Sequence, residues 1–173
     1  MNFDINKSIE ILERTPSVLE SMLSNLSTDW TKSNEGGETW SPFDVVGHML
    51  MGERVDWIER MQIILSETGN KEFRPFDRFA QFEYSKTKSM KDLLTEFHEL
   101  RKKNIATLKL VKLNEKILAK EGIHPSFGTV TLKQLLSTWV VHDLNHLAQI
   151  NRVMAKQYTD EVGPWKEYLR ILK

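Results

Sequence analysis

Two histidines four residues apart, His142 and His146, are the residues of this chain best placed to do chemistry. They lie in the segment 132–154, whose apolar residues recur with the period of an α-helix. At about 100° per residue, side chains at i and i+4 stand one above the other on one helix face. The apolar residues span an arc of roughly 140°, with His146 inside the arc and His142 at its edge. Two imidazoles that face a core need hydrogen-bond partners or a metal ion, and this spacing suits two ligands of one first-row transition metal.

The same spacing also fits two structural core histidines, so a metal site requires a third ligand. The chain has five His and no Cys. His48 is the best candidate, because it falls in a second helical segment, 41–65, that can face the first. His98 lies among charged residues and is expected at the surface, and His124 precedes a proline in a loop. On the wheel of its own segment, however, His48 falls about 200° from Val46 and the apolar stripe, so the wheel leaves open a surface position.

Three polar residues on or near the apolar arcs are candidates to assist such a site. Asp143 falls inside its arc and Glu53 at the edge of its own, and a buried carboxylate is costly unless it is paired or hydrogen-bonded. Each is a candidate to orient a ligand imidazole or to act in catalysis; for Asp143, a structural acceptor of backbone or indole N–H groups fits equally well. Gln149 could reach a metal-bound water or make an ordinary interhelical hydrogen bond. Arg152 points away from the histidine pair, toward a pocket rim or a dimer surface.

The apolar periodicity predicts an all-α protein, with helices at about 5–26, 41–66, 89–110, 132–158 and 165–172. Ser41-Pro42-Phe43-Asp44 and Thr131-Leu132-Lys133-Gln134 are strong helix-start signals. The Phe-rich segment 70–88 is expected to be an ordered crossing connection with room for a short helix. No strand is predicted. Four long helices with long crossover connections and a short C-terminal helix indicate a four-helix bundle, with Trp57 and Trp139 in its core.

Composition narrows the class of protein further. The 173 residues fit one domain, 1–173, and 24 basic residues balance 24 acidic ones. We therefore expect no binding of nucleic acid. The absence of Cys excludes disulfides and thiolate ligands, so any thiol chemistry needs a thiol cosubstrate. With no signal-peptide pattern and no run of about 20 apolar residues, we expect a cytoplasmic protein without membrane contact.

Several short sequence pieces, taken in order, resemble the DinB/YfiT-like family of four-helix-bundle metalloproteins. They are Trp40-Ser41-Pro42 ahead of His48, Gly122-Ile123-His124-Pro125, Phe127-Gly128-Thr129-Val130-Thr131-Leu132, and the run from His142-Asp143-Leu144-Asn145-His146 to Arg152. The resemblance implies that His48, His142 and His146 bind one divalent metal ion, usually nickel or zinc. It also implies that water or substrate completes the coordination shell. Related proteins are often homodimers, which agrees with the long apolar faces of the first and fourth helices.

The resemblance favours one reaction without excluding others. Three imidazoles and an open position are typical of a catalytic metal rather than a structural one. Such a metal lowers the pKa of a bound thiol or water. The function we expect is that of a thiol-dependent S-transferase, in which a low-molecular-weight thiol attacks a small electrophile. The alternatives are a metal-dependent hydrolase, with Glu53 as a base if it reaches the pocket, and a non-catalytic bundle whose metal only ties two helices together.

Overall fold

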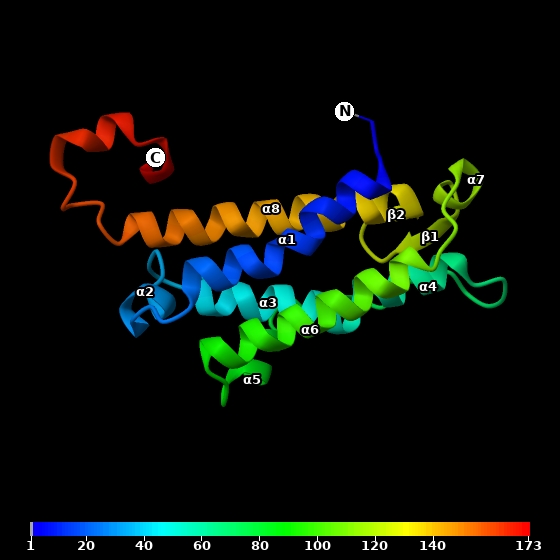
Figure 1. Cartoon of the computed structure of the whole chain (residues 1–173), viewed down its shortest axis with the longest axis horizontal. Helices are drawn as coiled ribbons and strands as arrows, with labels where there is room; N and C mark the ends of the chain where they lie inside the picture. The colour runs from blue at the N-terminus through cyan, green and yellow to red at the C-terminus, as the bar shows by residue number, and fades with distance from the viewer. Residues whose placement is uncertain (1) are drawn as a thin grey trace.

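The computed structural model describes residues 2–173, and four long helical units run side by side in it (Figure 1). These units are α1 (Ile5–Leu23), α3 with its continuation α4 (Pro42–Val55 and Trp57–Leu65), α6 (Met90–Lys109) and α8 (Leu132–Lys156). The connections carry the short helices α2 (Thr28–Lys32), α5 (Ala80–Ser85) and α7 (Glu115–Leu118). The predicted all-α bundle is confirmed, and so is a short helix in the Phe-rich connection.

Three of the long helices begin with a capping box, in which the N-cap and the third helical residue bond each other's backbone N–H groups. The predicted starts of α3 and α8 are therefore confirmed, and α6 begins in the same way. The pairs are Ser41–Asp44, Ser89–Asp92 and Thr131–Gln134.

The second long helix is interrupted, where the sequence predicts one continuous helix over 41–66. The break falls at Asp56, whose backbone leaves the helical region at φ −122° and ψ −71°. There the Trp57 indole lies over Gly52, where a Cβ would come within 3.0 Å of the indole Nε1. Trp57 also stacks on Trp139, with ring centroids 5.8 Å apart. Both indoles are buried, as predicted.

A small antiparallel hairpin, β1 (Glu121–His124) with β2 (Gly128–Thr131), corrects the prediction of no strands. Strands of four residues are too short to show a clear alternation of apolar and polar residues. Ile123 also exchanges backbone hydrogen bonds with the other long connection: it donates to Lys71 O at 2.8 Å and accepts from Phe73 N at 2.9 Å. The two crossover connections are thus joined at the end of the bundle where α8 begins.

The C-terminal segment forms two 3₁₀ turns, η1 (Gly163–Tyr168) and η2 (Arg170–Leu172), where the sequence predicts an α-helix. Leu172 is buried, whereas Trp165 and Tyr168 are mostly exposed. Among residues 2–173, no helix has the length and apolar character needed to cross a membrane.

The apolar core consists of two clusters with polar side chains between them. One contains Trp57, Trp139 and Ile105, near the hairpin. The other contains Phe97 and Ile150. Because α6 and α8 contribute to both clusters, and α3 and its continuation α4 to one each, the residues midway along these helical units meet in the centre of the bundle.

Candidate metal centre

His48 on α3 and the pair His142 and His146 on α8 bring their Nε2 atoms together. The Nε2 of His142 lies 3.2 Å from that of His48 and 3.1 Å from that of His146. Each of the three residues offers one ligand nitrogen within 4.8 Å of the others. The structure therefore assembles the histidines that the sequence singles out.

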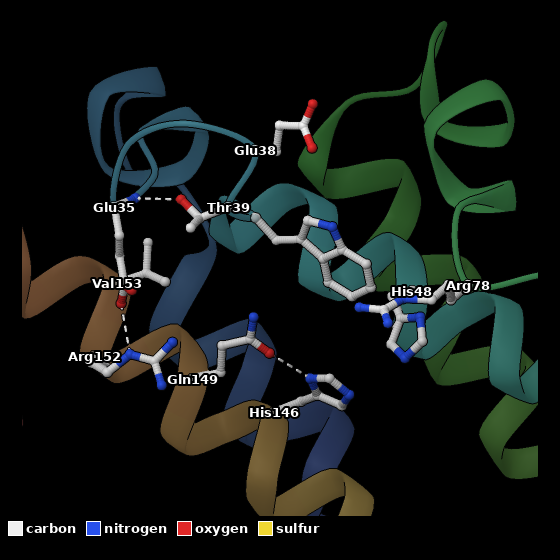
Figure 2. A pocket seen from close by; sticks show the side chains of 10 residues that line it. Glu35, Glu38, Thr39, His48, Arg78, His146, Gln149, Arg152 and Val153 are labelled. Carbon is white, nitrogen blue, oxygen red and sulfur yellow. Dashed lines mark hydrogen bonds and ion pairs between the residues drawn. The ribbon is translucent and has the colours of Figure 1, made fainter.

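A hydrogen bond at the other ring nitrogen of His146 fixes which nitrogen of this imidazole carries the proton. Its Nδ1 lies 2.8 Å from Oε1 of Gln149 (Figure 2). An amide oxygen only accepts hydrogen bonds, so Nδ1 carries the proton and Nε2 presents a lone pair. This is the usual arrangement of a metal-binding histidine, whose remote N–H is held by an oxygen acceptor.

All three imidazoles are held in the neutral form. Burial, helped by the nearby His146 and Arg78, lowers the pKa of His48 to about 4. Burial, followed by the neighbouring histidines and Arg101, lowers the pKa of His142 to about 2. Burial also lowers the pKa of His146, an effect that its bond to Gln149 opposes.

Three neutral imidazoles with converging Nε2 atoms fit a divalent cation. Metal–nitrogen bonds of about 2.0–2.1 Å place ligand nitrogens about 2.9–3.4 Å apart for angles between 90° and tetrahedral. The two separations that involve His142 fall within this range. Without a cation the His142 Nε2 can donate to at most one of its neighbours, so lone pairs would face each other. The donor set and its spacing therefore suit one metal ion with positions left for water or substrate.

His48 is buried, although it lies off the main apolar stripe of its segment. The rings of Trp40 and Phe76 pack against it, with centroids 4.9 and 5.5 Å from its own. Because α2, α5, α6 and α8 all contact α3, this helix has no single solvent face. A helical wheel that assumes one apolar face cannot detect such burial.

Glu53 and Asp143 bind Arg101 of α6 rather than a histidine. Arg101 Nη1 and Nη2 donate to the two carboxylate oxygens of Asp143 at 2.6 and 2.9 Å. Nη2 also donates to Glu53 at 2.8 Å. Glu53 accepts further bonds from Trp139 Nε1 and Asn104 Nδ2, both at 2.9 Å. The structure thus places neither carboxylate in contact with the imidazoles; both belong to a buried network that links α3, α6 and α8.

The network extends to α1 through a proline. Pro16 lies inside α1 and has no N–H to donate to the carbonyl of Leu12, four residues earlier. Arg101 Nη1 donates to that carbonyl at 2.8 Å. Burial alone lowers the pKa of Arg101, but Glu53 and Asp143 raise it overall, so the guanidinium stays charged. Arg101 therefore ties all four long helical units together beside the histidines.

A cavity of about 340 Å³ opens beside the histidines (Figure 2). His48 and His146 form part of its wall, together with Gln149. Arg152 also lines the cavity, which agrees with the expected position at a pocket rim. It donates to Glu35 at 2.6 Å. The remaining lining residues are Glu38, Thr39, Trp40, Arg78 and Val153.

The comparisons with known proteins agree with this fold and site. A family model of the DinB superfamily matches residues 11–150, a range that includes all three histidines. The chain belongs to the DinB superfamily. Among solved structures it is similar to YfiT from Bacillus subtilis, described as "a probable metal-dependent hydrolase with an unusual four-helix bundle topology". The TM-score is 0.72 at 24% identity, over 91% of this chain and 87% of that chain, which shows a shared fold. No curated protein matches the chain.

Arg101 is a central residue of this DinB-superfamily site that the sequence analysis does not identify. A usable signal exists, because Phe97, Arg101 and Ile105 follow one another at four-residue spacing on the apolar side of α6. Two carboxylates at apolar positions also indicate a buried partner, such as a cation. By contrast, Arg78 lies in an irregular segment, and its place in the cavity wall follows from no periodicity.

Proposed function

We propose that the protein is a metal-dependent enzyme that transfers a low-molecular-weight thiol to a small electrophile. The observation that carries the proposal is that three neutral imidazoles converge beside an open cavity, with His48 and His146 in its wall together with other polar groups. A metal that only ties two helices together needs no such cavity. The cavity therefore favours a catalytic role over a structural one.

A divalent cation held by the three histidines lowers the pKa of a thiol or water that occupies its remaining position. A thiol bound there would release its proton to solvent, with no protein base required. The overall reaction forms a bond between sulfur and an electrophilic carbon and breaks the bond to a leaving group, which departs with the electron pair.

The chain's own carboxylates support a reaction that needs no base at the histidines. Glu53 is buried among Arg101, Trp139 and Asn104, so its oxygens are already engaged. The two acids of the cavity wall, Glu35 and Glu38, lie across the cavity from His48 and His146 (Figure 2). Base-assisted hydrolysis through Glu53 is thus disfavoured.

The test is thiol conjugation by the nickel- or zinc-loaded protein. Loaded protein is expected to accelerate the reaction of a small thiol with monochlorobimane, whereas the metal-free form and His146→Ala lose this acceleration. His98→Ala is a matched control, because His98 is exposed and belongs neither to the histidine cluster nor to the cavity wall. If no thiol is consumed faster than in the absence of protein, the proposal is wrong.

Metal-dependent hydrolysis is the second candidate, and the description of YfiT favours it. A hydrolase would turn over an ester or amide without added thiol, at a rate that rises through a pKa near ~7. Elemental analysis after growth with nickel or zinc tests the metal itself. About one ion per chain is expected, and none in the His142→Ala variant.

A further inference from the structure

Arg78 places a positive charge in the cavity wall that also contains His48 and His146. Its guanidinium lies over the rings of Trp40 and Phe79, 5.7 and 5.2 Å from their centroids. Figure 2 shows Arg78 beside His48. No carboxylate among residues 2–173 forms an ion pair with it. Arg78 is exposed, and two aromatic contacts position its charge at the cavity, where it is available to an anionic group of a bound ligand.

The other side of the cavity carries two carboxylates, Glu35 and Glu38. Glu35 is neutralised there by Arg152 at 2.6 Å and by Lys156 at 3.9 Å. Glu38 is exposed, and within the described part of the chain it has no ion pair. Figure 2 shows Glu38 across the cavity from Arg78. The cavity therefore has one uncompensated positive group and one uncompensated negative group, on opposite sides.

The amide of Gln149 adds a neutral donor between them. Because its oxygen is used by His146, its nitrogen is free to donate, and Figure 2 shows this nitrogen pointing away from His146. The volume of about 340 Å³ is at the small end of the range for small-molecule sites.

We infer that the substrate held beside the histidines is a small zwitterion, with a carboxylate that binds Arg78 and an ammonium group that binds Glu38. This inference rests on the proposed function and names the class of thiol that it uses: an amino-carboxylate thiol rather than a neutral one.

Four small thiols separate the two charged contacts. 2-Mercaptoethanol carries neither charged group, and cysteamine carries only the ammonium. 3-Mercaptopropionate carries only the carboxylate, and cysteine carries both. Their dissociation constants are measured on cobalt-loaded protein from the sulfur-to-metal absorption band. Each thiol is compared between wild type and variant, because its own acidity and chelating power cancel in that ratio.

Arg78→Gln is expected to weaken 3-mercaptopropionate and cysteine by about 5- to 10-fold and to leave the other two thiols unchanged, as for a partly solvated charge pair. Glu38→Gln is expected to weaken cysteamine and cysteine by about 3- to 5-fold. Arg74→Gln is the matched control, since Arg74 is exposed in the same connection but does not line the cavity. If Arg78→Gln changes all four thiols by the same factor, or none, the inference is overturned.

Binding of a ligand that has no thiol tests this inference separately from the proposed function. β-Alanine binding to the zinc-loaded protein is followed by saturation-transfer NMR, with the uncharged analogue propionamide for comparison. If no thiol perturbs the cobalt band but β-alanine binds and Arg78→Gln abolishes its signal, thiol transfer fails while the zwitterion site stands. If β-alanine gives no signal above that of propionamide, the zwitterion site fails.

Discussion

Replacing Arg101 by methionine removes the cation between two buried carboxylates. Methionine keeps most of the length and apolar volume of the side chain, so the change isolates the charge and its hydrogen bonds. The side chains of Glu53 and Asp143 are 0% and 1% exposed, so water cannot replace the guanidinium. Glu53 keeps its bonds from Trp139 and Asn104, whereas Asp143 loses both of its bonds to Arg101.

The expected loss follows from this geometry. Removing one partner of a buried ion pair costs about 3–5 kcal/mol, because the remaining charge is left uncompensated. The carbonyl of Leu12, which Pro16 leaves without its helical partner, also loses its donor. We therefore expect the free energy of unfolding of Arg101→Met to fall by about 4–5 kcal/mol at pH 7. Adding Asp143→Asn should restore about 2 kcal/mol, because a neutral amide is cheaper to bury than an unpaired carboxylate.

Urea denaturation of the metal-free proteins, followed by circular dichroism, measures both changes. Lys102→Met is the control, because Lys102 is the exposed neighbour of Arg101 on α6 and should change stability by less than about 0.5 kcal/mol. A loss of less than 1 kcal/mol in Arg101→Met, or no recovery in the double variant, would refute the reasoning. Folded Arg101→Met should also bind zinc about 10-fold more weakly, since the network joins the helices that carry the ligands.

Three further predictions concern acid, packing and assembly. The pKa values of His48 and His142 in the folded protein are lowered from 6.5, so the unfolded chain takes up protons first as the pH falls. The free energy of unfolding of the metal-free protein should therefore fall by about 2 kcal/mol per histidine between pH 7 and 5. Unfolding midpoints that do not change over this range would contradict this. Gly122→Ala should cost about 1–3 kcal/mol in urea denaturation, because the new Cβ would lie 2.6 Å from the Phe73 ring, and wild-type stability would show that the hairpin shifts freely. We expect a homodimer, since α8 and the C-terminal turns expose apolar side chains such as Leu144; monomers alone in sedimentation at micromolar concentration would disprove it.

The sequence predicts the parts of the site that depend on helix periodicity. His142 and His146 are recognisable because an i, i+4 pair shares one helix face whatever surrounds the helix. His48 is harder to place, since its burial depends on Phe76 and α5, which come from a connection without periodicity. The wheel positions of Glu53 and Asp143 correctly mark them as inward-facing carboxylates.

The partners of those carboxylates cannot be read from one helix at a time. Arg101 lies in a charged stretch of sequence, and only the packing of α6 against α3 and α8 shows that it faces inward. The sequence does not reveal the hairpin at 121–131 for a related reason. Its pairing is backbone to backbone over four residues per strand, and the link through Ile123 to Lys71 joins segments about fifty residues apart.

The histidines and the cavity residues Arg78 and Glu38 come from different kinds of segment, and this division has a consequence for protein engineering. His48, His142 and His146 lie on long helices that Arg101 holds in register. Trp40 and Arg78 come from the connections before α3 and α5. Exchanging the residues of these two connections other than Trp40 and Phe76, which pack on His48, should therefore change ligand selectivity while the metal-binding histidines keep their places. A library confined to these two connections is a practical starting point for new substrates on this bundle.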